Sequence, residues 1–179
     1  MDINHRVILS GLSIGALGAS GLAAPAGAAG IDLTVTIPQL KVAEYHRPYV
    51  AIWIESKDSA AAKTVAIWYE AKNKDNGGQT WLRDVRQWWR KSGRTLKLPA
   101  DGISGATRAP GAQKISFMAG RAPMGNLAPG NYELVVEAAR EVGGREALRL
   151  PFAWPPKAAQ TVRAAGKTEL GAITAVIKP

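Results

Sequence analysis

Hydrophobic and polar residues alternate along much of the chain after residue 30, which is the pattern of half-buried β-strands. From 31 to 37 every second residue is aliphatic and the residues between are Asp or Thr, so one face of this strand is buried. Residues 49–55 (YVAIWIE) are apolar almost throughout, which predicts a central strand covered on both sides. The same reasoning predicts further strands at 64–71, 114–119, 132–139, 147–154 and 168–177.

Turn residues separate these stretches. Residues 72–78 (KNKDNGG) and 142–144 (VGG) predict turns, and the Pro129-Gly130-Asn131-Tyr132 turn before a strand is familiar from immunoglobulin-like sandwiches. One short helix is predicted near 81–90, because Leu82, Val85 and Trp89 have i, i+3, i+7 spacing. About eight short strands and one short helix predict an all-β fold, an immunoglobulin-like β-sandwich. The βαβ pattern of a Rossmann-type dinucleotide site is absent.

Composition excludes several kinds of chemistry. The 179 residues suit a single domain, and 46% hydrophobic residues are too many for a disordered chain. The chain has no cysteine, which excludes disulfides, thiolate metal sites and cysteine nucleophiles. Of its two histidines, His5 lies in the N-terminal segment and only His46 remains, so a histidine-built metal site is rejected. A hydrolase is the weakest alternative, since no Ser-His-Asp set is recognisable.

Residues 1 to about 29 have the features of a signal peptide. Arg6 precedes an apolar, Gly- and Ala-rich run from Val7 to Leu22, and Ala26-Gly27-Ala28 fits a cleavage site. The alternative is a membrane anchor, but the run is shorter than the roughly 20 strongly apolar residues of a spanning helix. We expect export to the periplasm, cleavage, no stable membrane insertion afterwards, and one sandwich domain over 30–179.

The formal net charge is +9, and the densest basic group is interleaved with indoles. We call residues 81–97 the Trp/Arg segment. It contains Trp81, Arg83, Arg86, Trp88, Trp89, Arg90, Lys91, Arg94 and Lys97. Its indoles either close one end of the core or form a stacking wall for a flat aromatic ligand whose phosphate the arginines hold. Single-stranded nucleic acid also suits this pattern, but an exported chain seldom meets it, so no nucleic-acid partner is expected.

The motif loop, residues 101–107 (DGISGAT), is a glycine-rich loop that presents a threonine. Gly102 and Gly105 admit positive φ, and Asp101 and Ser104 can bond their own backbone. Asp101, Ser104, Gly105, Ala106 and Thr107 resemble the acceptor motif of proteins that carry covalent FMN. In that class a Mg-dependent FAD:protein FMN transferase cleaves FAD and joins FMN to the last threonine by a phosphoester bond. The resemblance implies that Thr107 is the acceptor and that Asp101 shapes the loop for the transferase and contacts its metal.

Two further residues are candidates for contact with the cofactor. Arg108 follows the motif and could stabilise the phosphodiester charge, although an ordinary solvated arginine is an equal alternative. Trp88 of the Trp/Arg segment is the candidate aromatic contact for the flavin.

The chain as a whole is similar to a family of predicted periplasmic proteins of unknown function, commonly found beside PepSY-type membrane proteins. The similar stretches are 47–55, 81–90, 101–107 and 127–132. This resemblance implies an exported sandwich that works with a PepSY-type transmembrane redox protein. The resulting hypothesis is an electron-transfer flavoprotein rather than a stand-alone enzyme. The competing hypothesis is a cofactor-free periplasmic binding or assembly module.

Overall fold

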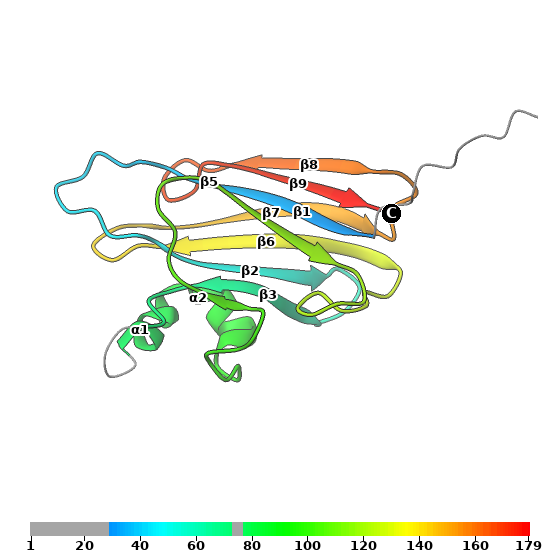
Figure 1. Ribbon diagram of the computed structural model, residues 1–179, viewed down its shortest axis with the longest axis horizontal. Coiled ribbons are helices and arrows are strands. Elements are labelled where there is room, and N and C mark those ends of the chain that lie inside the picture. The colour runs from blue at the N-terminus through cyan, green and yellow to red at the C-terminus, as the bar shows by residue number, and fades with distance from the viewer. Residues whose placement is uncertain (1–28, 73–76) are drawn as a thin grey trace, which may run out of the picture.

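A computed structural model of the chain describes residues 29–72 and 77–179, and it contains two β-sheets packed face to face (Figure 1). The first sheet has the strand order β5-β1-β9-β8, and the second has the order β4-β3-β2-β6-β7. The strands are β1 (Gly30–Ile37), β2 (Tyr49–Ser56), β3 (Ala62–Trp68), β4 (Ser104–Gly105), β5 (Gly111–Met118), β6 (Gly130–Ala139), β7 (Arg145–Trp154), β8 (Gln160–Ala165) and β9 (Ala172–Lys178). All pairings are antiparallel except that of β3 with β4.

The main core lies between the two sheets, and the alternating residues of β1 point into it. Ile31, Leu33, Val35 and Ile37 are at most 1% exposed, as their spacing predicts. Facing residues come from β2 and β6 of the second sheet, and β9 contributes residues beside β1, so the core spans strands far apart in the sequence. The two-sheet sandwich is therefore confirmed, whereas its immunoglobulin-like connectivity stays a prediction.

A helical segment, residues 77–93, covers the other face of the second sheet. It consists of α1 (Gly77–Thr80), the 3-10 turn η2 (Trp81–Asp84), α2 (Arg86–Trp88) and the π-helical turn η3 (Trp89–Gly93). Leu82, Val85 and Trp88 point inward and form a second core with Trp53 of β2 and Tyr69 after β3. Covering on both sides explains why Tyr49–Ile54 is buried at every position.

The prediction of one short helix is wrong in its continuity. Val85 has ψ of 71°, which is outside the helical range and interrupts the helix. The chain resumes at α2, where the Glu137 carboxylate accepts the backbone N–H groups of Gln87 and Trp88. A side chain from β6 thus provides the cap that the local sequence lacks.

Several predicted boundaries also differ. The strand expected at 64–71 ends at Trp68, and the strand expected at 168–177 begins only at Ala172. β4 and β8 were not predicted, because β4 has two residues and the inward side chains of β8, Val162 and Ala164, are only half-buried. Of the predicted turn 72–78, residues 73–76 lie outside the described residues, and 77–78 begin α1. The predicted signal peptide lies outside them up to residue 28.

A buried ion pair joins the two sheets at one end. Arg140 follows β6, and Glu169 precedes β9. The Arg140 Nε–H donates to Glu169 Oε2 at 2.9 Å, and its Nη2–H donates to Oε1 at 3.2 Å. Glu169 Oε1 also accepts the Gly144 N–H at 2.7 Å. The Arg140 and Glu169 side chains are buried, at 6% and 4% exposed. Each charge therefore depends on the other for the compensation that water would otherwise provide.

Candidate functional site

The motif loop lies at the edge of the second sheet. Its central residues form β4, which pairs in parallel with the end of β3. The Ile67 N–H donates to the Ile103 carbonyl at 2.8 Å, and the Tyr69 N–H donates to the Gly105 carbonyl at 2.9 Å. These two bonds fix the backbone up to Gly105. Ala106 and Thr107 follow directly, beyond the last ladder bond.

The first half of the loop is a closed turn. Ser104 Oγ accepts the Ala100 N–H at 2.9 Å, and the Ser104 N–H donates to the Ala100 carbonyl at 2.9 Å. Gly102 has φ of +70°, which favours glycine. Ser104 and Gly102 therefore have identities that the fold itself explains.

The other motif residues have identities that the fold does not explain. Asp101 and Ala106 are exposed, and Thr107 is half-buried. Within the described ranges, the Asp101 carboxylate and the Thr107 hydroxyl make no hydrogen bond or ion pair. Gly105 does not have positive φ, and a Cβ atom there would come no closer than 3.4 Å to its neighbours, an ordinary contact. A side chain at 105 is compatible with this backbone, so folding does not require the glycine.

Arg108 brings a positive charge to the motif loop. Its guanidinium carbon lies 5.3 Å from the centroid of the Trp68 ring, a cation–π arrangement. Its Nη2 atom is 3.7 Å from where a Cβ of Gly105 would be. In the described part of the chain no carboxylate pairs with Arg108. The guanidinium therefore keeps hydrogen-bond donors available beside the predicted acceptor.

The three tryptophans of the Trp/Arg segment differ in position. Trp88 is 0% exposed, and its Nε1–H donates to Thr64 Oγ1 at 2.9 Å. Trp89 is half-buried, with its ring centroid 6.2 Å from that of Trp88. Trp81 is 52% exposed. The structure thus places Trp88 in the second core, away from any surface, and leaves Trp81 as the accessible indole.

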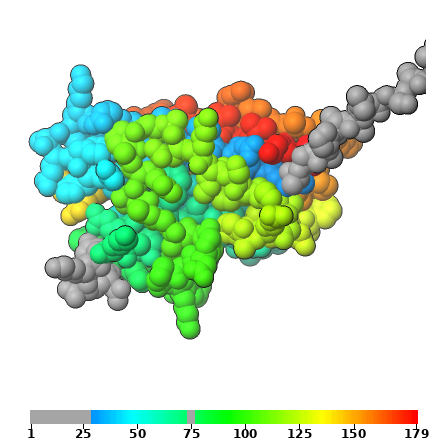
Figure 2. All heavy atoms as spheres, viewed as in Figure 1, coloured from blue at the N-terminus to red at the C-terminus, as the bar shows by residue number. Residues whose placement is uncertain are grey.

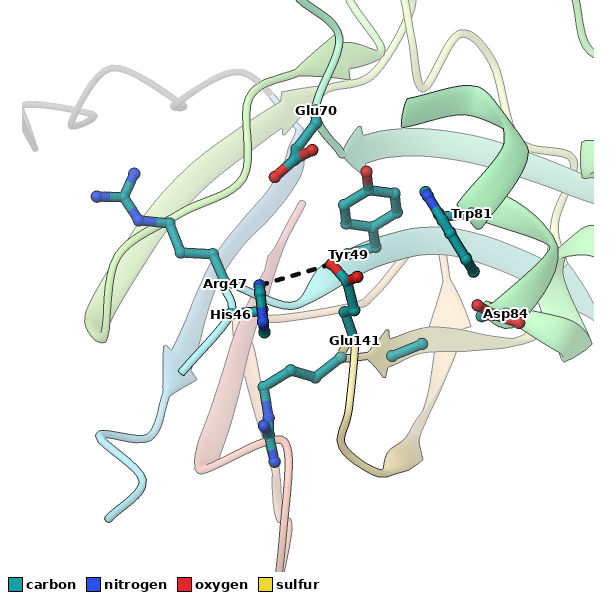
Figure 3. Close-up of a pocket in the computed structure, with 9 residues that line it drawn as sticks. His46, Arg47, Tyr49, Glu70, Trp81, Asp84 and Glu141 are labelled. Atoms are coloured by element: carbon teal, nitrogen blue, oxygen red, sulfur yellow. Dashed lines mark ion pairs between the residues drawn. The ribbon is translucent and has the colours of Figure 1, made fainter. Parts of the chain in front are cut away.

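Trp81 lines a small cavity at one end of the second sheet (Figure 3). The motif loop pairs with β3 at this end, next to Tyr69 and Glu70. The cavity holds about 30 Å³ and adjoins a wider depression of about 520 Å³ that shares Trp81 and Arg140. Glu70, on its wall, directly follows Tyr69, whose N–H binds the Gly105 carbonyl. Sequence analysis missed this cavity because its walls come from three separate strand ends.

Polar groups converge on this cavity. His46 lies between two carboxylates, with Nε2 at 3.0 Å from Glu44 Oε1 and Nδ1 at 3.5 Å from Glu141 Oε2. Burial, together with the nearby Glu70 carboxylate, raises the pKa of Tyr49 to about 12, so its phenol stays protonated at neutral pH. The wall therefore offers a neutral hydroxyl and an indole face. Across the described ranges, no cluster of three or more His, Cys, Asp or Glu side chains is arranged to hold a metal ion.

The fold defines the class: a two-sheet β-sandwich with a helical layer on the outer face of one sheet. Residues 30–172 match the family model described as "Predicted periplasmic protein (DUF2271)", so the chain belongs to this family. Membership confirms the resemblance to a family of predicted periplasmic proteins and the periplasmic location, whereas the FMN acceptor motif and the PepSY neighbourhood stay predictions. Among the described residues, no helix has the length and apolarity of a transmembrane span. No curated protein and no solved structure matches the chain.

Proposed function

We propose that this protein is a periplasmic flavoprotein that carries FMN covalently on Thr107 and exchanges electrons with a PepSY-type transmembrane redox partner. A single observation carries the proposal: most side chains of the motif are not used by the fold. A loop that serves only to lead from the helical segment through β4 to β5 has no need of the full Asp-x-x-Ser-Gly-Ala-Thr pattern. A second recognition event, by an FAD:protein FMN transferase, accounts for it.

Each unused residue has a chemical role in that recognition. The Asp101 carboxylate is an oxygen ligand of the kind that Mg²⁺ prefers, and it has no partner within the described chain. Gly105 and Ala106 are small, which admits the loop to an enzyme site. The Thr107 oxygen takes the FMN phosphate as FAD is cleaved between its two phosphates, and AMP leaves with the hydroxyl proton. Ser104 holds the turn that presents these groups.

The surroundings of Thr107 fit the cofactor. Arg108 provides a guanidinium for the phosphodiester, where a charge-assisted hydrogen bond is stronger than a neutral one. We assign the aromatic contact to Trp81 in place of Trp88, because Trp81 is exposed and lines the cavity beside the end of β3. When bound, FMN supplies the redox chemistry, while the protein holds the group and tunes it. Covalent attachment prevents loss of the flavin by diffusion outside the cytoplasm.

Intact mass tests this proposal. The protein is co-expressed and exported with an FMN transferase that is active on a known substrate. The expected mass gain is one FMN less one water, absent in Thr107→Ala and retained in the matched control Thr161→Ala, an exposed threonine of β8. An unmodified wild-type mass, or a modified Thr107→Ala protein, would contradict the assignment.

A second candidate is the cofactor-free binding or assembly module. The observation that favours it is a basic groove on the helical segment that lacks acidic partners among the described residues. This alternative predicts a colourless protein after co-expression with the transferase. Binding through the groove does not itself exclude covalent FMN, because the groove and the motif loop use different residues; the colour of the co-expressed protein distinguishes the two candidates.

A further inference from the structure

The outer surface of the helical segment contains a groove lined by cations. Its volume is about 220 Å³. Its walls are Arg83, Arg86, Trp89, Arg90 and Arg94, which we call the arginine groove. Among the residues that the structure describes, no carboxylate lines it. In the space-filling view, the green residues of this region project from the body of the molecule (Figure 2).

The charges of the arginine groove are uncompensated. Arg83 donates from Nε to the Thr80 carbonyl at 3.1 Å. Across the described ranges, Arg86, Arg90 and Arg94 make no ion pair. Residues three or four positions apart share one side of a helical surface, so these like charges repel one another. The folded chain gains nothing from gathering them, which points to an external anion.

The fold holds this surface rigidly. The Glu137 carboxylate accepts the N–H groups of Gln87 at 3.1 Å and of Trp88 at 2.9 Å, and Glu137 is 0% exposed. The Trp88 indole is fixed to Thr64 on β3. A segment anchored in this way presents its outward arginines without the entropy loss of ordering a mobile tail.

We propose that the arginine groove docks the protein on an anionic phospholipid bilayer. Guanidinium groups bind phosphate by paired hydrogen bonds, and juxtamembrane cations are attracted to anionic headgroups. Trp89 in the groove adds an indole, a side chain that favours the membrane–water interface. An acidic protein partner is the alternative occupant, since Trp and Arg are also enriched at protein interfaces, and the experiment below distinguishes the two. This proposal stands independently of the flavin.

Vesicle sedimentation tests the docking. The purified wild-type protein is mixed with vesicles of phosphatidylcholine alone or with phosphatidylglycerol added. We expect partition onto the phosphatidylglycerol vesicles only, weakening as salt rises. Arg86→Gln/Arg90→Gln/Arg94→Gln should lower the partition coefficient roughly 100-fold, because each cation near an anionic surface contributes about fivefold. The matched control is Arg121→Gln/Lys157→Gln/Arg163→Gln, which removes three exposed cations elsewhere.

The outcomes separate cleanly, provided that circular dichroism confirms folding of both triple variants. A selective loss in the groove variant supports the proposal. An equal loss in both variants would show that net charge alone drives adsorption and would overturn it. Absence of binding to phosphatidylglycerol vesicles, together with groove-dependent binding to an acidic periplasmic protein, would also overturn it in favour of a protein partner.

Discussion

The helical segment and the motif loop flank the same strand, β3, yet the fold uses them in opposite ways. The helical segment is held by side chains, with Trp88 and Val85 in the second core and Glu137 capping α2. The motif loop is held by backbone bonds from β3 and by the Ser104 hydroxyl. The inward side chains of the helical segment are therefore needed for folding, whereas most side chains of the motif loop are not. Function is best sought among polar side chains that the fold leaves unused.

The largest expected effect is at Trp88, which the comparison places in the second core. Trp88→Ala should lower the free energy of unfolding by about 3–5 kcal/mol, because it removes a fully buried indole and leaves a cavity. Urea denaturation measures the loss. Trp81→Ala is the matched control, and its surface position predicts a change within about 0.5 kcal/mol. Equal losses in the two variants would contradict the buried and exposed assignments.

Glu137→Gln tests the cap on the helical segment. An amide cannot accept both the Gln87 and Trp88 N–H groups as the carboxylate does, so the expected loss is about 1–3 kcal/mol. Hydrogen exchange should show faster exchange at these two amides than at the Ile67 and Tyr69 amides, which bind the motif loop. Uniformly faster exchange across both regions would mean that they are not separate units.

Arg149 ties the helical segment to the sheet, and its effect should depend on pH. Its Nη1–H donates to Glu55 and Glu133, and its Nη2–H donates to Gln87. The hydrogen bond from Arg149 lowers the pKa of Glu133 below its usual value. For Glu55, burial acts to raise the pKa, but the hydrogen bonds from Trp53 and Arg149 outweigh burial, so the pKa of Glu55 is also lowered.

Lowered carboxyl pKa values contribute stability above their unfolded value of 4.5, and this contribution is lost as pH falls through the folded values. Arg149→Met should therefore cost about 1 kcal/mol at pH 7, a small value because the Arg149 side chain is 40% exposed. The difference from wild type should shrink below about pH 4.5 in thermal denaturation curves. A difference that is constant from pH 7 to pH 3 would refute the electrostatic origin.

Gly105→Ala should have little effect on stability, and it separates folding from recognition in the motif loop. The added methyl meets no atom closer than 3.4 Å, so the free energy of unfolding should change by less than about 1 kcal/mol. If a transferase needs the small residue, covalent FMN should nevertheless disappear from the intact mass. A destabilised variant, or a stable one that still carries FMN, would remove the argument that Gly105 serves recognition.

Periodicity was enough to find the strands with aliphatic inward faces. β1 and β2 match their predicted spans within one residue. The alternating aliphatic residues of β1 indicate burial of one face, and the continuous apolar run of β2 indicates burial of both faces. β8 was not predicted, because its inward side chains, Val162 and Ala164, are small and only half-buried at a sheet edge and give a weak hydrophobic pattern. The helical break at Val85 depends on Glu137, which is 52 residues away, and no local pattern contains that information.

The candidate site was only partly accessible from sequence for a similar reason. The motif loop could be recognised because its residues are contiguous. Trp88 and Trp81 share the same local composition, and only the packing of β3 and β6 against the segment decides which indole is buried. The cavity of His46, Glu70 and Glu141 joins three strand ends that no spacing rule relates.

The buried pair of Arg140 and Glu169 also constrains how this sandwich can diverge. Replacing either residue alone would leave an unpaired charge in the interior. The resulting loss of folding free energy is one that few marginally stable domains tolerate. The two positions should therefore be inherited as a unit across descendants, replaced together or kept together. Such correlated substitution would mark where the two sheets meet in relatives whose remaining residues have drifted beyond recognition.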